Sequence, residues 1–222
     1  MKEMVNNMLE NKKYILTVEG ETEKIYFQWL RDKINECEKR KYNVSFTIKV
    51  QQSPRDFYKG TNSKIVPKAI HVCDIESLDK VHVDKFKKIL DEMKEAKKEK
   101  NINYSLAYSN YSFELWIVLH KKACNKRLNH RKDYLATINE CFNEKFEDLG
   151  HYKREKDFMR CLSKLTLDDV KKAIERAEKI NSQNIINGYK EESYKGYKYF
   201  KENPSLSIHE QVKTILIECG VF

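Results

Sequence analysis

The sequence has few of the residues that mark turns: its 222 residues include only 6 glycines and 3 prolines. That scarcity argues against collagen-like, proline-rich and turn-dense all-β proteins, and favours long helices. No run of about 18 apolar residues occurs, so we expect no membrane-spanning helix. Residues 1–13 are polar and lack the apolar segment of a secretory signal. These absences predict a cytoplasmic protein without a membrane anchor.

Several motifs with a well-defined chemistry are also missing. The six cysteines form no C-x-x-C pair, so we expect reduced thiols and neither a disulfide framework nor a zinc site. No G-x-x-x-x-G-K-[ST] segment is present, which excludes a P-loop, and no G-x-S-x-G segment carries a nucleophilic serine. A PD-(D/E)-x-K nuclease core is a poor fit, because the E-x-K segment at Glu92 falls in a charged helical pattern.

Positive charge is in excess, with 43 Lys and Arg against 34 Asp and Glu and a net charge of +9. Two interpretations fit this excess. One is a lysine-rich surface that only keeps the protein soluble, and the other is a face that attracts phosphate, for which nucleic acid is the natural polyanion. Because the charge is not gathered into a tail, the fold must build any binding face.

Short apolar runs alternate with helical periodicity in the first 120 residues. Four strands are expected, at 14–18, 44–50, 69–73 and 104–108. Helices are expected after the first, third and fourth of these strands, with Thr22 as the cap of the first helix. This order predicts an α/β fold, with a mainly parallel, Rossmann-like sheet covered by helices.

The second half of the chain has a different pattern. No strand is expected after residue 121, and the apolar spacing predicts three helices, at 133–146, 167–180 and 207–219. No repeat or low-complexity linker separates the two halves. We therefore expect a core at 1–120 and a helical elaboration at 121–222 that packs on it, as a single domain.

Carboxylates fall where ligands gather in open α/β sheets, directly after strands. Glu19 follows the first strand, Asp74 and Glu76 follow the third, and Glu23 lies one helical turn after Glu19. Acids that converge in this way call for a hard divalent cation, and a second cation would complete the clamp used for phosphodiester cleavage. The alternative is that Glu19 and Glu23 are N-terminal helix acids, while Asp74 and Glu76 cap the next segment.

Glu114 stands in a nearly all-apolar segment, residues 113–119, where an unpaired carboxylate is costly. We expect it either to join the metal site or to pair with a Lys or Arg of the helical half. Its neighbours Asn110, Ser112 and His120 are expected to be caps or hydrogen-bonding core residues.

Aromatic and cationic residues interleave near the C-terminus, over residues 189–201. Such a segment can stack bases and hold phosphates. The alternative is a helix that packs through its aromatic residues, with lysine stems lying over it.

Three segments resemble the motifs of known families. Residues 18–24, V-E-G-E-T-E-K, resemble the first motif of Toprim domains, in the E-G-x-T-E form of overcoming-lysogenization-defect nucleases. Residues 109–120 resemble the S-N-P-x-F-E-L-W segment of the RloB family, and residues 203–209 its N-P-S-T-x-V-H ending. The resemblance to RloB runs in order from about residue 13 to 217.

The resemblance implies a Toprim-like fold and a Mg²⁺-dependent (or Mn²⁺-dependent) nuclease in bacterial antiphage defence, of the abortive-infection kind. Glu19 would bind metal or orient water, Asp74 and Glu76 would hold metal, and Glu23 and Glu114 would complete the metal site. Two residues depart from the pattern: Glu76 stands for the second aspartate of D-x-D, and Tyr111 for the proline of S-N-P.

The resemblance also implies partners. The substrate would be DNA or RNA, with tRNA among the candidates, and an ATPase of the ABC or SMC-like class would be the protein partner. A homo-oligomer is left open. The alternative function is a catalytically weak Toprim-like module that binds nucleic acid, or a regulatory subunit of an ATPase complex.

Overall fold

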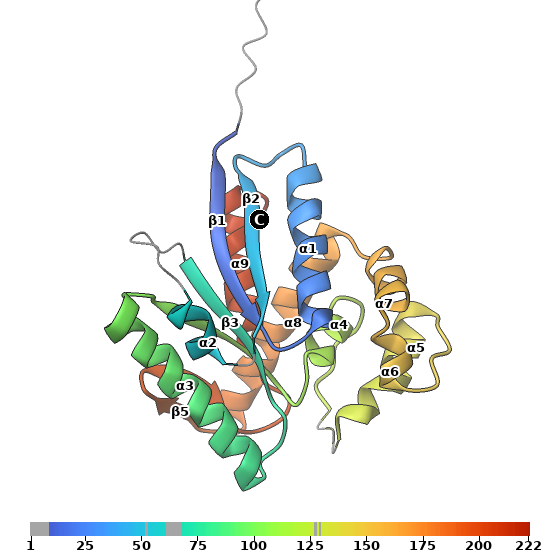
Figure 1. The fold of residues 1–222 in the computed structure, drawn as a ribbon. Coiled ribbons are helices and arrows are strands. Elements are labelled where there is room, and N and C mark those ends of the chain that lie inside the picture. The colour runs from blue at the N-terminus through green and yellow to red at the C-terminus, as the bar shows by residue number, and fades with distance from the viewer. Residues whose placement is uncertain (1–8, 52, 61–67, 127, 129) are drawn as a thin grey trace, which may run out of the picture.

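The computed structural model describes residues 9–51, 53–60, 68–126, 128 and 130–222 (Figure 1). Its centre is a four-stranded sheet in the order β2-β1-β3-β4, and every pair of neighbours is parallel. The strands are β1 (Asn11–Val18), β2 (Asn43–Val50), β3 (Lys68–Ile75) and β4 (Tyr104–Asn110). The predicted α/β fold with its parallel sheet is confirmed, and all four predicted strands are present.

Helices cover both faces of this sheet, with α3 on the side opposite α1 and α4 (Figure 1). The helices of the first half are α1 (Glu21–Glu36), α2 (Pro54–Lys59), α3 (Lys80–Lys100) and α4 (Glu114–Leu119). Those of the second half are α5 (Tyr134–Phe142), α6 (Leu149–Tyr152), α7 (Glu155–Leu162), α8 (Leu167–Ile186) and α9 (Ile208–Cys219), preceded by the 3-10 turn η1 (Arg131–Asp133).

The sheet separates two hydrophobic clusters, because alternate residues of a strand face opposite sides. In β1, Leu16 and Val18 join the cluster beneath α1, α4, α8 and α9, while Ile15 joins the cluster beneath α3. The helices of the second half thus pack into the same cluster as α1. The division of the chain at residue 120 stays a prediction.

The expectation of no strand after residue 121 is wrong. A two-stranded antiparallel hairpin, β5 (Glu191–Tyr194) and β6 (Tyr197–Phe200), lies within the segment where aromatic residues and lysines interleave. Its two-residue loop, Lys195 and Gly196, has φ of 54° and 91°, as a hairpin turn of the primed type requires. The interleaving therefore has the period of a strand, and the helix proposed for this segment is not formed.

The hairpin buries two of its aromatic residues and leaves Tyr194 and Tyr197 half-buried. Tyr199 and Phe200 are 5% and 4% exposed, and the Tyr199 ring lies 5.0 Å from that of Phe86 on α3. The Tyr194 hydroxyl donates to the Asp91 carboxylate. These contacts attach β5 and β6 to α3, so Tyr199 and Phe200 are core residues.

Smaller departures have local causes. Gly20, in an extended conformation, is the N-cap of α1, whereas the predicted cap Thr22 lies inside the helix and is buried. The short helices α2, α6 and α7 were not predicted, because their six, four and eight residues are too few for an apolar period to repeat. The six cysteines are free thiols, as expected. In the described part of the chain, no helix has the length and apolar character needed to cross a membrane.

Candidate active site: a carboxylate cluster at the carboxyl edge of the sheet

Glu19 and Asp74 meet because β1 and β3 are neighbouring parallel strands. Val18 is in register with Val72, so the ends of both strands lie at the same edge. The backbone N–H of Asp74 donates to Oε2 of Glu19 over 3.2 Å. Strand β3 runs through Asp74 to Ile75, two residues further than predicted, so Asp74 belongs to the strand and does not follow it.

Glu23 joins these two acids through the turn between β1 and α1. A Cβ at Gly20 would lie 3.1 Å from Oε2 of Glu23, so the small residue leaves room for a carboxylate that folds back over the turn. Glu23 is only 7% exposed. The glycine of the E-G-x-T-E segment thus has a steric role in placing Glu23 beside the end of β1.

Poor solvation and mutual repulsion raise the pKa values of three of these acids. Desolvation is the largest cause for Glu19, for Glu23, whose pKa rises to about 7, and for Asp74, whose pKa rises well above its usual range. Part of Asp74 is exposed, but the charges of Glu23, Glu19 and Glu114 add to the effect of its desolvation. Four carboxyl groups therefore share one poorly solvated region.

Glu114, at the first position of α4, is completely buried and has an ion-pair partner. Lys153 Nζ, directly after α6, lies 2.9 Å from its Oε1, and the Ser112 hydroxyl donates to its Oε2. The ion pair with the helical half, one of the two expectations for Glu114, is confirmed. Burial acts to lower the pKa of Lys153, but Glu114, Asp74 and Glu23 raise it. Lys153 is therefore a shared counter-charge for the cluster.

Glu76 lies at the same edge but has different surroundings. Lys85 Nζ on α3 lies 2.8 Å from its Oε1, and Arg131 and His82 lie 3.9 and 3.8 Å from its Oε2. The hydrogen bond from Lys85 is the main reason that the pKa of Glu76 is lowered. Lys85 Nζ also lies 3.7 Å from Oε1 of Glu19, and so stands between the two glutamates.

The fit of this site to a divalent cation is best judged from its oxygen atoms. Oε1 of Glu19 is buried and has no hydrogen-bond partner, and carboxylate oxygens are the ligands that hard cations prefer. Among the described residues, however, no three His, Cys, Asp or Glu side chains are grouped so that they could hold a metal ion. The donor chemistry of Glu19, Asp74 and Glu23 thus fits Mg²⁺, while their arrangement requires a side chain to move before three of them share an ion.

A cavity of about 650 Å³ lies next to the cluster, between η1, α5 and α6. Two of its lining residues, Arg131 and Lys153, contact Glu76 and Glu114. The rest of the lining is mixed and consists of Lys132, Leu135, Glu147, Asp148, Leu149 and Gly150. Sequence reasoning missed Lys85, Arg131 and Lys153. In a chain with 43 basic residues, no local pattern distinguishes the few that a fold brings to its acids.

Two other motif residues support the site without entering it. The Asn110 amide donates to the carbonyl oxygens of Lys201 and Glu202, and its backbone N–H donates to Ser205 O over 2.9 Å. These bonds tie the segment before α9 to the end of β4. His120 is buried between the Tyr26 hydroxyl and the Trp116 carbonyl, and burial lowers its pKa to about 4. Both residues are hydrogen-bonding core residues, as expected.

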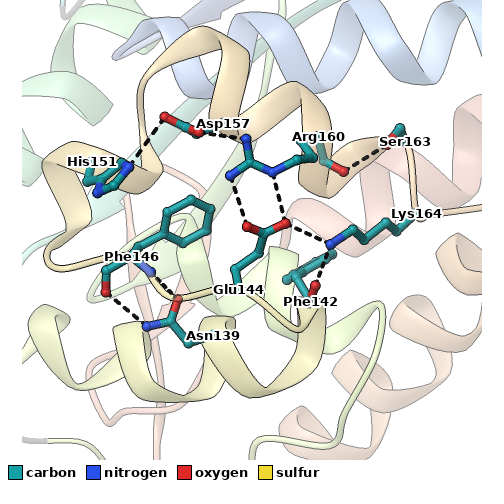
Figure 2. Close-up of polar contacts among 9 residues, drawn as sticks. All are labelled: Asn139, Phe142, Glu144, Phe146, His151, Asp157, Arg160, Ser163 and Lys164. Carbon is teal, nitrogen blue, oxygen red and sulfur yellow. Dashed lines mark hydrogen bonds and ion pairs between the residues drawn. The ribbon is translucent and has the colours of Figure 1, made fainter.

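A second group of acids, in the helical half, serves as a contrast (Figure 2). Glu144 accepts two bonds from Arg160, of 3.0 and 2.9 Å, and one of 2.7 Å from Lys164. Asp157 accepts a further bond of 2.7 Å from Arg160. These ion pairs connect the end of α5 to α7. Because cations already neutralise both acids, we do not expect a metal ion to bind here.

Comparison with known proteins identifies the family. The family model of RloB-like proteins matches residues 14–215, which include the carboxylate cluster, Lys85 and Lys153. No curated protein and no solved structure matches the chain. Because the match spans most of the sequence, the chain belongs to the RloB-like family.

Proposed function

We propose that this RloB-like protein is a Mg²⁺-dependent nuclease that hydrolyses phosphodiester bonds in DNA or RNA. The observation that carries the proposal is the contact between Glu19 and Asp74 at the ends of two neighbouring strands, with Glu23 and Glu114 close by. Acids held together with raised pKa values are a common feature of catalytic sites. A structural role would favour cations in ordinary ion pairs, as Glu144 has them.

Each acid takes the role that the resemblance implies for it. Asp74 and Glu76 would hold the metal, and Glu19, whose Oε1 lacks a hydrogen-bond partner, would bind metal or orient the attacking water. Glu23 and Glu114 would complete the negative field around them. When bound, the metal would polarise the phosphate and lower the pKa of a bound water.

The substrate would approach from the cavity beside the cluster. Arg131, Lys132 and Lys153 contribute positive charge to its lining, which also includes the acids Glu147 and Asp148. Cations so close to the acids would hold the phosphates on either side of the scissile bond. The role in antiphage defence and the ABC or SMC-like ATPase partner rest on the resemblance, and they are part of the proposal on that ground.

One observation favours the alternative, a catalytically weak module that binds nucleic acid or regulates an ATPase. Glu76 is engaged by Lys85, and within the described part of the chain no three ligands are assembled for a metal. A protein that only binds nucleic acid could keep the ion pair between Glu76 and Lys85 throughout its function. A nuclease must change it when metal binds.

The experiment that separates these functions uses one substitution and one control. The purified protein is incubated with plasmid, single-stranded DNA and total tRNA, in Mg²⁺, Mn²⁺ or EDTA. We expect the wild type to cleave at least one substrate with metal, and Glu19→Gln to lose cleavage, because an amide is a poor ligand for a hard cation and a poor base. The control Glu21→Gln changes an exposed acid of the same turn and should cleave as the wild type does.

Binding is measured in EDTA on the same variants. Glu19→Gln should bind nucleic acid at least as well as the wild type, since it removes a negative charge. Affinity should fall steeply between about 50 and 200 mM salt, as counterion release requires. If Glu19→Gln cleaves at the wild-type rate, or if the wild type binds and never cleaves, the nuclease proposal is wrong and the binding module replaces it.

A further inference from the structure

Lys85 lies between two acids of the proposed metal site. Its Nζ lies 2.8 Å from Oε1 of Glu76 and 3.7 Å from Oε1 of Glu19. The second of these atoms is buried and without a hydrogen-bond partner, while the other oxygen of Glu19 is engaged by Asp74 N–H. The ammonium group therefore stands beside the carboxylate oxygens that the proposed metal would need.

We propose that Lys85 is the internal counter-ion of the metal-free site, and that a divalent cation binds Glu19 and Glu76 together only by displacing it. This inference rests on the proposed function. An ion with oxygen ligands at 2.0–2.1 Å has to draw the two carboxylates together, and the ammonium group lies against both of them. A lysine and a divalent cation a few ångströms apart also repel each other strongly.

Removal of Lys85 would affect the two glutamates differently, because they differ in the other cations near them. Glu76 would keep Arg131 and His82 near its Oε2. Glu19 has no other cation within 4.0 Å among the described residues, since Lys153 pairs with Glu114. Without Lys85, the metal-free site should be less stable, and a divalent cation should bind the two carboxylates without competition from the ammonium group.

The length of Glu76 offers a second way to change the same contact. A glutamate reaches Lys85 over 2.8 Å, and an aspartate at this position would be shorter by one methylene group. Glu76→Asp keeps the charge and a metal-binding carboxylate but weakens the bond to the lysine. It should therefore shift the competition toward the metal without removing any charged group.

The test measures metal binding without nucleic acid. Mn²⁺ and Mg²⁺ affinities are determined by isothermal titration calorimetry on the wild type, Lys85→Met, Glu76→Asp and the control Lys88→Met, which removes an exposed lysine from the same helix. We expect Lys85→Met to bind Mn²⁺ roughly tenfold more tightly, because a unit charge next to the ion is removed. Glu76→Asp should bind more tightly by a smaller factor, and Lys88→Met should be unchanged.

Thermal unfolding gives a second readout. The melting temperature of Lys85→Met in EDTA should be lower than that of the wild type. Addition of Mn²⁺ should raise the melting temperature of the variant more than that of the wild type. If Lys85→Met does not fold, Lys85→Gln takes its place, since it also removes the charge and leaves both proposed ligands unchanged. Equal or weaker metal binding in the Lys85 variant overturns the inference but leaves the nuclease proposal intact. Tighter binding in a protein that cleaves nothing supports the inference and contradicts the nuclease, and no metal binding in any protein overturns both.

Discussion

Glu23 and Glu144 are both glutamates surrounded by charged side chains, yet their pKa values move in opposite directions. Hydrogen bonds from Arg160 and then Lys164 lower the pKa of Glu144 to about 2 (Figure 2). Desolvation, with the charges of Glu114 and Glu19, raises the pKa of Glu23 to about 7. Residue type alone therefore says little about the role of an acid. The balance of nearby acids and cations decides it.

That balance differs between the two regions. In the helical half, Glu144 and Asp157 share Arg160, and Lys164 adds a second cation to Glu144. At the edge of the sheet, the acids outnumber the cations. The five acids are Glu19, Glu23, Asp74, Glu76 and Glu114, and the cations in contact with them are Lys85, Lys153, Arg131 and, when protonated, His82. A surplus of poorly solvated acids lowers stability and is common in functional sites, and the proposed function rests on it.

Cleavage should show the largest difference between the acids at the edge of the sheet and those of the helical half. Asp74→Asn should lower the rate of Mg²⁺-dependent cleavage at least about a hundredfold, because it removes a metal ligand and leaves the shape of the side chain unchanged. Its melting temperature in EDTA should equal or exceed that of the wild type, since repulsion with Glu19 and Glu23 is relieved. Glu144→Gln should cleave normally well below its melting temperature. A large loss of stability in Asp74→Asn would instead mark Asp74 as a structural residue.

An effect of intermediate size is expected on the stability of the helical half. Glu144→Gln should lower the free energy of unfolding by about 1–3 kcal/mol, because Arg160 and Lys164 lose a shared carboxylate that is largely shielded from water. Melting should shift by about 2–4 °C per kcal/mol in a chain of this size. The control is Glu140→Gln on α5, an exposed acid paired with Lys122, for which little change is expected. Equal effects of the two substitutions would remove the distinction between a packed network and a surface pair.

The smallest effect is the pH dependence of the metal-free protein. The folded pKa of Glu23, about 7, exceeds its usual value of 4.5, so its stabilising contribution is complete below about 4.5 and is lost as the pH rises through about 7. Glu144, with a folded pKa of about 2, contributes above about 4.5 and loses its contribution as the pH falls toward 2. The melting temperature in EDTA should therefore rise by a few degrees as the pH is lowered from 8 to about 5, and it should fall at lower pH.

Substitutions assign the two limbs of this pH profile. Glu23→Gln should reduce the rise between pH 8 and 5, to which Asp74 and Glu19 also contribute because their pKa values are raised too. Glu144→Gln should reduce the fall below about pH 4.5. Each variant should leave the other limb in place. A profile in which Glu23→Gln keeps the whole rise would show that Glu23 is well solvated in the folded protein.

The sequence was sufficient for the features that depend on local periodicity. The four parallel strands follow from short apolar runs, although β3 and β4 run two residues past their predicted ends. A parallel sheet then brings Glu19 and Asp74 to one edge. The lysines could not be found in this way, since Lys85 and Lys153 reach the acids only through the packing of α3 and of the segment after α6. The hairpin was missed because its loop places a lysine, Lys195, at positive φ. This conformation is uncommon for residues other than glycine, so the sequence gives no sign of the turn.

We propose that Glu19 and Asp74 share a divalent cation that the paired acids of the helical half do not bind. Crystals of the protein grown with Mn²⁺ test it directly through anomalous scattering. We expect an anomalous peak within about 2.2 Å of carboxylate oxygens of both Glu19 and Asp74, with Lys85 moved away from Glu19. A peak at Glu144, or no peak near Glu19 at a Mn²⁺ concentration that supports cleavage, would contradict it.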